Sequence, residues 1–418
     1  MVRERVIDMF LSFLILFVNL SLCVYSLGNL LFIFFLLISF TFIAWSCNES
    51  WGNISLRNKK EQYFELMFLM SLILTLFMMV SFKVELLWVV FTLEFQGFII
   101  LGACYIFQSN GVKLKLLEGS INYIFPSFFS FTLMLTYILG VNLLPLMDPQ
   151  KYVFKVILII SVLIKAGSFP FYSWVPVVYT SVSYPTLLLI AIMSKIIVIL
   201  LLVEYIPTLH SVIIFSGLFS ILISSLMMVN QAKIKKLLAF SSVSNIGWVL
   251  LIIISAKSDL ILNLSQVDVL GVFFFLYSYN LLVLCCNLRG KNCGQIYNLF
   301  IDVNSEKQFY FFFFLLVNCF LGMAGLPPFS GFLGKFCVIS SIINNNIILG
   351  LSLLLVSSLF AFNYLRPIIG VYNTFSPHST IVRNSYNLKN IKNSLIWLSS
   401  LLLILNIYIT FIGLCSLF

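Results

Sequence analysis

Residues 152–206 read YVFKVILIISVLIKAGSFPFYSWVPVVYTSVSYPTLLLIAIMSKIIVILLLVEYI and decide the class of fold. The stretch holds two apolar runs, each long enough to cross a hydrocarbon core of roughly 30 Å as a helix. Each run carries a lysine, Lys165 in the first and Lys195 in the second, and the first is interrupted at Gly167 and Pro170. A charged side chain at this depth is costly unless it faces a protein interior or a water-filled cavity. The stretch therefore predicts a membrane protein whose buried lysines mark an ion or proton route.

The whole chain has the same character. Of its 418 residues 61% are hydrophobic and 9% are charged, and its mean hydropathy is +1.10. The apolar runs are continuous, whereas the strands of a transmembrane barrel alternate apolar and polar residues. We predict an all-α polytopic membrane protein. The net charge of +10 then reports orientation in the membrane, and we expect no nucleic-acid partner.

The apolar runs predict about thirteen transmembrane helices. They cover roughly residues 6–27, 28–46, 63–81, 84–107, 119–142, 152–178, 184–206, 210–229, 235–256, 266–288, 309–342, 347–370 and 393–417. If the crossings alternate, most lysines and arginines fall on the side that holds the N-terminus. The positive-inside rule therefore places the N-terminus inside.

A matched interruption divides the middle of the chain into two halves. KAGSFPF at 165–171 and MAGLPPF at 323–329 each break the fourth span of a half. Five spans per half force the halves into opposite orientations, as in the inverted repeats of many transporters. The prolines remove backbone donors and are predicted to break the helices at Pro170, Pro327 and Pro328. The expected organisation is N-terminal helices of variable extent at 1–62, inverted five-helix repeats at 63–207 and 208–371, and a loop with a C-terminal helix at 372–418.

Four charged side chains lie inside predicted spans: Glu94, Lys165, Lys195 and Lys335. A nearby carboxylate favours the protonated form of a buried lysine, and desolvation favours the neutral form. A lysine whose carboxylate partner moves is therefore a switchable proton site. The alternative is that these charges form structural ion pairs between helices.

Three stretches carry a family resemblance: the run from Lys165 to Lys195, QAKIKKLLAFSSVSNIGW at 231–248 and AGLPPFSGFLGKF at 324–336. In this order they resemble the antiporter-like membrane subunits of respiratory NADH:quinone oxidoreductase, complex I, over roughly residues 63–370. The chain 2 group of that family fits best, because the chain 4 group has a glutamate at the position of Lys335 and the chain 5 group is much longer.

The resemblance implies a proton relay. The family has a lysine five residues before the first break proline, matched by Lys165, and a lysine in a Ser-Lys-Ile setting, matched by Lys195. Lys335 matches the lysine of a Gly-Lys-Phe setting after the second break, and Glu94 matches a glutamate on an early helix. By resemblance the proton passes from the Glu94–Lys165 pair to Lys195 and then to Lys335.

One position departs from the family. A helix of the second repeat often carries histidine where this chain has Asn245. Asparagine does not change protonation state near neutral pH. We therefore give Asn245 no titrating role and expect it to hold water together with Ser241, Ser242 and Ser244.

The resemblance also implies the wider setting. The chain has no Gly-rich nucleotide loop and no iron–sulfur cysteine pattern, so we expect it to bind no cofactor or metal directly. NADH, FMN, iron–sulfur clusters and ubiquinone then belong to other parts of the complex. Expected partners are other complex I membrane subunits, including neighbouring antiporter-like chains, and lipids such as cardiolipin. Two alternatives stay open: a subunit of a multisubunit cation/proton antiporter, and a scaffold subunit that conducts nothing.

The residue composition also indicates the cellular compartment. The 44 phenylalanines, with many Ile, Leu, Asn and Lys, suggest translation from an A/T-rich genome. Together with the resemblance they favour a multi-pass protein of the mitochondrial inner membrane with its N-terminus in the matrix. A bacterial plasma membrane is the alternative.

Overall fold

A computed structural model of the chain describes residues 86–106, 113–143, 148–205, 210–255, 266–288, 306–327, 329, 331–345 and 347–374. All regular structure in these residues is helical. The predicted spans at 6–27, 28–46, 63–81 and 393–417 lie outside the described residues, and so does Pro328.

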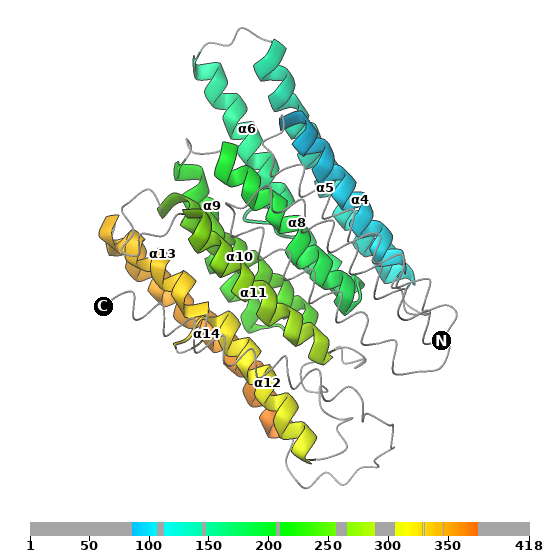
Figure 1. Ribbon diagram of the computed structural model, residues 1–418, viewed down its shortest axis with the longest axis vertical. Coiled ribbons are helices and arrows are strands. Elements are labelled where there is room, and N and C mark those ends of the chain that lie inside the picture. The colour runs from blue at the N-terminus through cyan, green and yellow to red at the C-terminus, as the bar shows by residue number, and fades with distance from the viewer. Residues whose placement is uncertain are drawn as a thin grey trace, which may run out of the picture.

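The helices follow one another along the chain and are labelled in Figure 1. They are α4 (Leu86–Ile106), α5 (Lys113–Leu143), α6 (Asp148–Ala166), α7 (Trp174–Ser181), α8 (Tyr184–Tyr205), α9 (His210–Val229), α10 (Ile234–Ser255), α11 (Gln266–Leu288), α12 (Glu306–Ala324), α13 (Gly331–Asn345) and α14 (Ile347–Thr374). The predicted span at 152–178 is divided into α6 and α7, and the one at 309–342 into α12 and α13.

Several of these helices have the length and composition of membrane spans. In the described part of the chain four do so without interruption: Lys115–Val141, Ser211–Val229, Ile234–Ile253 and Ile347–Gly370. Leu86–Gly102, Leu276–Cys285 and Phe313–Ala324 are shorter apolar helices. The chain is therefore a helical membrane protein.

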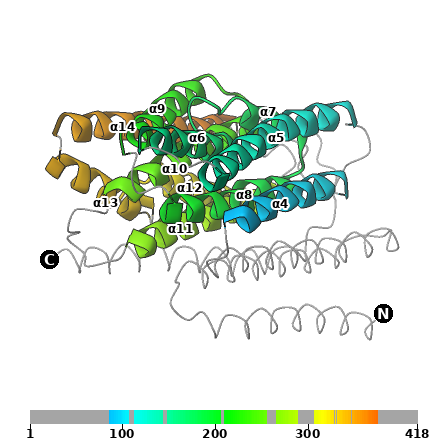
Figure 2. The same ribbon diagram turned by 90° about the horizontal axis from the view of Figure 1, so that it is seen from above.

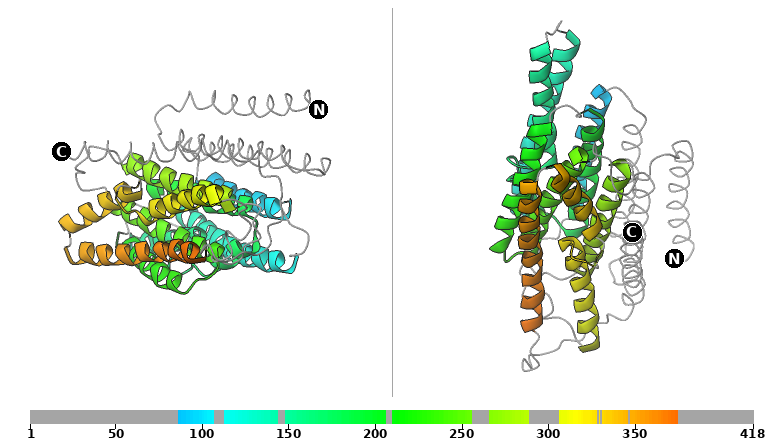
Figure 3. Two further views of the ribbon diagram at one scale, coloured as in Figure 1. Left: turned by 90° about the horizontal axis from the view of Figure 1, so that it is seen from below. Right: turned by 90° about the vertical axis from the view of Figure 1, so that its left-hand side faces the viewer.

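The helices run alongside one another, with α4 and α5 along one edge and α12 to α14 along the opposite edge (Figure 1). Seen from above or below, most of the helices form two rows (Figures 2 and 3). One row holds α5, α6, α7, α9 and α14, and the other holds α4, α8, α11 and α13. α10 lies between the rows and packs against α7, α8, α9, α11 and α13. This central position explains why every residue from Leu237 to Ile252 is buried.

Glycine allows α10 to approach α9 closely. A Cβ atom on Gly247 would lie 2.7 Å from Cγ1 of Ile221 and 2.8 Å from the carbonyl oxygen of Gly217. Membrane helices commonly pack through such small residues, because lipid supplies no hydrophobic force between helices. α10 is consequently held tightly in the middle of the bundle.

The two predicted breaks have the same local geometry. α6 ends at Ala166 and α12 at Ala324, and the glycines that follow, Gly167 and Gly325, have φ values of 72° and 73°. Positive φ favours glycine, because it carries no Cβ atom. Matching backbone hydrogen bonds recur at both breaks: Gly167 N to Leu163 O and Gly325 N to Leu321 O, each 3.1 Å, then Phe171 N to Ser168 O at 2.7 Å and Phe329 N to Leu326 O at 2.8 Å.

Candidate proton-transfer site

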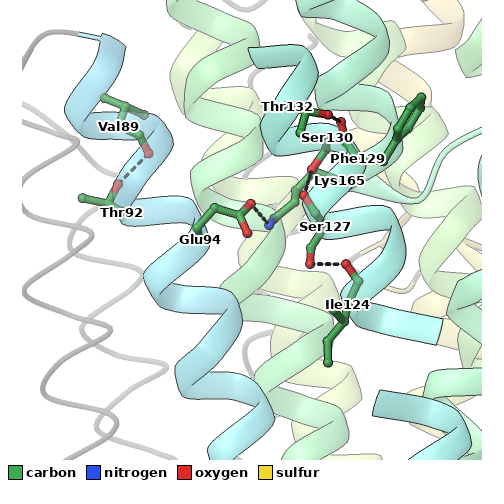
Figure 4. A network of polar contacts seen from close by, with 9 residues as sticks. All are labelled: Val89, Thr92, Glu94, Ile124, Ser127, Phe129, Ser130, Thr132 and Lys165. Carbon is green, nitrogen blue, oxygen red and sulfur yellow. Dashed lines mark hydrogen bonds and ion pairs between the residues drawn. The ribbon is translucent and has the colours of Figure 1, made fainter. Parts of the chain in front are cut away.

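An ion pair joins α4 to α6. The Lys165 ammonium donates a hydrogen bond to Oε1 of Glu94, with an Nζ–Oε1 distance of 2.7 Å. Figure 4 shows the two side chains pointing toward each other from their helices. The Lys165 side chain is 6% exposed and that of Glu94 is 13% exposed. A buried charge is tolerated only with a partner, so each residue stabilises the ionised form of the other.

The first helix break leaves Lys165 available for this pairing. Lys165 lies in the last turn of α6, where backbone carbonyls lose their helical donors. Other groups supply the missing donors: Gly167 N and Ser168 N bond to Leu163 O, and Trp174 Nε1 donates to Ile164 O at 3.3 Å. The ammonium therefore does not have to cap its own helix.

Serines of α5 lie in the same region but donate their hydroxyl hydrogens to their own helix. Ser127 Oγ bonds to Ile124 O at 2.8 Å, and Ser130 Oγ bonds to Ser127 O at 2.7 Å (Figure 4). A hydroxyl used in this way can still accept a hydrogen bond on its oxygen. These serines can accept a hydrogen bond from water or an ammonium without leaving their helix.

Lys335 takes a different kind of partner. From α13 its ammonium donates to Met323 O at 3.2 Å and to Ala324 O at 2.6 Å, the last carbonyls of α12. The end of a helix carries partial negative charge on such carbonyls. The rings of Phe360 and Trp248 lie 4.8 and 5.7 Å from Nζ and add cation–π attraction. The end of the broken helix thus serves as the counter-charge of this lysine.

The absence of a side chain at Gly325 allows Lys335 to reach the end of α12. Replacing Gly325 should therefore disturb this contact. A Cβ atom at Gly325 would lie 2.7 Å from Cδ of Lys335 and 3.0 Å from its Nζ, and the φ of 73° is itself unfavourable for alanine. The backbone alone costs roughly 1–2 kcal/mol in this region. We expect Gly325→Ala to displace Lys335 and to lower both proton transport and the melting temperature.

The matched control is Gly102→Ala. A Cβ atom at Gly102 meets no other atom within 4 Å, and the residue lies inside α4. Proton transport and thermal stability of the assembled protein are measured for both variants. If Gly325→Ala behaves like Gly102→Ala in both measurements, Gly325 has no role in holding Lys335.

Lys195 links α8 to α10. Its ammonium is buried and donates to Ser242 O at 3.0 Å. Within the described residues neither Lys195 nor Lys335 has a carboxylate within ion-pair distance, in contrast to Lys165. Both lysines therefore lack the full negative charge of a carboxylate, which stabilises the ammonium form of Lys165.

The polar stretch of α10 lies beside Lys195. Ser241, Ser242 and Ser244 donate their hydroxyl hydrogens to Leu238 O, Ala239 O and Ser241 O, each at 2.7 Å. Their oxygens are left as acceptors. Asn245 is buried, and its Nδ2 has no hydrogen-bond partner in the structure.

The structure therefore brings some of the predicted residues together and separates others. Glu94 and Lys165 are in contact, whereas no direct hydrogen bond joins Lys165, Lys195 and Lys335 to one another in the part of the chain that is described. Pro170 and Pro327 lie in the two turns, both exposed.

Lys235 was not predicted as a site residue. Its Nζ donates a hydrogen bond to Val182 O at the end of α7, 2.5 Å away. It also lies 5.0 Å from the centre of the Tyr184 ring. Its signal in the sequence is its place in the first turn of a largely apolar helix, next to Lys236.

The described residues contain no group of three or more His, Cys, Asp and Glu side chains that could hold a metal ion. Cys104, Cys285 and Cys319 are free and buried.

Known proteins share both the sequence pattern and the fold. Residues 88–361 match the family described as NADH:quinone oxidoreductase/Mrp antiporter, TM. NADH-ubiquinone oxidoreductase chain 2 of Anopheles gambiae is 30% identical over 311 residues, 72% of this chain and 86% of the relative. The protein of the same name from Oryzorictes hova is 26% identical over 288 residues, 68% of this chain and 75% of the relative.

A solved structure gives the same architecture. A chain of respiratory complex I from Thermus thermophilus with bound aureothin superposes with a TM-score of 0.74 at 17% identity, covering 97% of this chain and 93% of that chain. The fold and the buried charges define a polytopic, antiporter-like membrane protein. This chain belongs to the NADH:quinone oxidoreductase/Mrp antiporter transmembrane family.

Proposed function

We propose that this chain is the antiporter-like, proton-translocating subunit of NADH:ubiquinone oxidoreductase, complex I. In this proposal quinone reduction elsewhere in the complex drives protons through Glu94, Lys165, Lys195 and Lys335. The buried Glu94–Lys165 ion pair of 2.7 Å beside a helix break is the observation that carries it. The shared name of the two animal relatives supports the assignment to complex I rather than to a cation/proton antiporter.

The ion pair is the switch. While the Glu94 carboxylate stays beside Lys165, the ammonium form of the lysine is stabilised. When α4 and α6 move apart, or when Glu94 takes up a proton, the charged lysine loses its partner and desolvation favours proton release. One pKa unit corresponds to about 1.4 kcal/mol. A neighbouring opposite charge shifts a pKa by about 1–3 units, so loss of the partner contributes roughly 1.4–4 kcal/mol to proton release.

Lys195 and Lys335 are the acceptors. Both are buried and bonded to backbone carbonyls. A neutral amine still has hydrogens to donate, so the carbonyls of Ser242 and Ala324 keep a partner when the lysine gives up a proton. Each lysine can therefore change protonation state without leaving a buried carbonyl unsatisfied.

The proposed architecture has about thirteen transmembrane helices, with inverted five-helix repeats at 63–207 and 208–371. The recurrence of one break geometry at Gly167 and Gly325 supports this division. The N-terminus faces the mitochondrial matrix, and the protein spans the inner membrane. For a bacterial source, the plasma membrane takes the place of the inner membrane.

The partners in this proposal are the other membrane subunits of complex I, including neighbouring antiporter-like chains, and membrane lipids such as cardiolipin. The chain takes no part in electron transfer. NADH, FMN, iron–sulfur clusters and ubiquinone are bound by other subunits, so its contribution to the enzyme is to move protons.

Native isolation tests the proposal. Solubilisation in mild detergent is expected to yield a particle with NADH:ubiquinone activity in which flavin, iron–sulfur and quinone-site subunits accompany this chain. A particle that holds only antiporter-like chains and no redox subunits would instead establish a multisubunit cation/proton antiporter. The family itself includes both kinds of protein, so subunit identification by mass spectrometry is the deciding measurement.

A further inference from the structure

Unsatisfied polar atoms gather in one part of the molecule. In the described residues seven buried side-chain nitrogen or oxygen atoms have no hydrogen-bond partner, and all seven belong to α7, α10, α11 or α14. Four of them are Tyr179 Oη, Asn245 Nδ2, Tyr277 Oη and Tyr364 Oη. Buried polar groups are normally hydrogen-bonded to protein or to ordered water. Their concentration around one helix points to a shared polar site.

The three tyrosine hydroxyls approach the polar stretch of α10 from three different helices. The hydroxyl of Tyr179 approaches Ser242, that of Tyr277 approaches Asn245, and that of Tyr364 approaches Ser241. Tyr277 is also within electrostatic range of both other tyrosines. None of these approaches has the geometry of an ordinary hydrogen bond. The hydroxyls therefore converge without bonding directly to one another or to α10.

The same stretch of α10 lies between two relay lysines. Lys195 bonds to Ser242 O, and Lys335 lies 5.7 Å from the Trp248 ring, six residues or about 9 Å further along the helix. The Phe360 ring that contacts Lys335 is 5.1 Å from the Tyr364 ring. Tyr277, which approaches Asn245, therefore lies between the two lysines along α10. Tyr179 and Tyr364 approach α10 at its Lys195 end, and the Phe360 ring connects Tyr364 to Lys335.

The tyrosines differ from the neighbouring polar residues in their ability to pass on a proton. The α10 serines have committed their hydrogens to backbone carbonyls, and the indole of Trp248 is a donor only. The amide of Asn245 does not titrate. A phenolic hydroxyl both donates and accepts, so it can receive a proton on its oxygen while it releases its own hydrogen on the other side.

We infer that the hydroxyls of Tyr179, Tyr277 and Tyr364, bridged by water, form a neutral relay between Lys195 and Lys335, with Tyr277 compensating for the non-titrating Asn245. The inference rests on the proposed function. One proton leaves the Lys195 ammonium, each hydroxyl accepts one proton and passes on another, and one proton arrives on the Lys335 amine. The tyrosines and Asn245 are uncharged before and after the transfer, and no electron moves.

Tyr277→Phe tests the relay in the assembled complex. The substitution removes one oxygen atom that has no protein partner, so the complex is expected to assemble and to oxidise NADH. We expect the initial rate of NADH-driven proton transport in sealed membrane vesicles to fall about tenfold, or about 1.4 kcal/mol in barrier height. Tyr137→Phe is the matched control, because Tyr137 is half-buried on α5, which is not among the helices that pack closely against α10.

A rescue variant distinguishes proton transfer from packing. Asn245→His places a titrating group beside position 277, and in the Tyr277→Phe background it is expected to restore proton transport. If transport falls in Tyr277→Phe and the histidine does not restore it, the hydroxyl acts by packing and the relay is overturned. Unchanged transport in Tyr277→Phe overturns it as well. Tyr179→Phe and Tyr364→Phe supply the same test if Tyr277→Phe fails to assemble.

Lys335→Met separates this inference from the proposed function. If Lys335→Met stops proton transport while the three Tyr→Phe variants transport normally, the tyrosine relay is wrong and the lysine pathway stands. If Lys335→Met also transports protons normally, the proposed pathway through this chain is wrong, and the tyrosine relay is rejected with it.

Discussion

Glu94→Gln is expected to lower NADH-driven proton transport about a hundredfold in complexes that still contain the protein. The substitution keeps the size of the side chain and removes the negative charge 2.7 Å from Lys165 Nζ. Without the carboxylate the ammonium form of Lys165, which carries the proton, is disfavoured. A hundredfold loss of rate corresponds to a rise of about 2.7 kcal/mol in the barrier to transfer. Proton transport per assembled complex in sealed vesicles, with NADH oxidation recorded in parallel, measures the effect.

Two further variants show whether the loss reflects proton transfer or structure. Glu118→Gln removes an exposed carboxylate from α5 and is expected to change nothing. The double variant Glu94→Gln with Lys165→Met replaces the ion pair by neutral groups, so assembly should recover while transport stays low. If the double variant transports protons at the normal rate, the pair is structural, as the alternative interpretation of these charges holds.

Lys335→Arg is expected to leave the complex assembled and unable to pass protons through the second half of the chain. The guanidinium can still donate to the Met323 and Ala324 carbonyls, and it stays protonated at any pH at which the protein is folded. The end of α12 therefore keeps its cation, but the proton is not released. We expect a loss of transport of about a hundredfold, comparable to that of Lys335→Met.

The two substitutions at Lys335 differ in stability. Lys335→Met leaves the α12 carbonyls without their donor, so it should lower the melting temperature of the complex, whereas Lys335→Arg should lower it less. Lys233→Met, at an exposed position before α10, is the control for loss of a positive charge. Normal transport by Lys335→Arg would contradict a relay role, because the lysine would then be needed only for its charge.

Much of the fold could be predicted from local sequence. Burial of a span in lipid depends on the apolar character of about twenty consecutive residues, so the predicted limits of 210–229 and 266–288 coincide with α9 and α11. The two helix breaks were also predicted from local properties, in this case the backbone preferences of proline and glycine. Pro170 and Pro327 lack a backbone donor, and Gly167 and Gly325 accept a positive φ, whatever surrounds them.

The partners of the buried lysines needed the tertiary structure. Glu94 and Lys165 are 71 residues apart, and Lys195 bonds to a carbonyl 47 residues away, so no local pattern joins them. The sequence identified the lysines without showing that Lys335 would be balanced by the end of α12 instead of by a carboxylate. It also did not show that Lys235 would turn inward to Val182.

The three tyrosines show most clearly the difference between what local sequence predicts and what the tertiary structure decides. Along the chain Tyr179, Tyr277 and Tyr364 are ordinary aromatic residues of apolar helices, and nothing in their local sequence separates them from core side chains. The sequence by itself determined that this is a helical membrane protein with two broken helices and charged residues inside its spans, because hydrophobicity and backbone preference belong to each residue. Only the tertiary arrangement of α7, α10, α11 and α14 decided which polar groups meet, because a hydrogen bond or an ion pair depends on distances between helices that lie far apart in the chain.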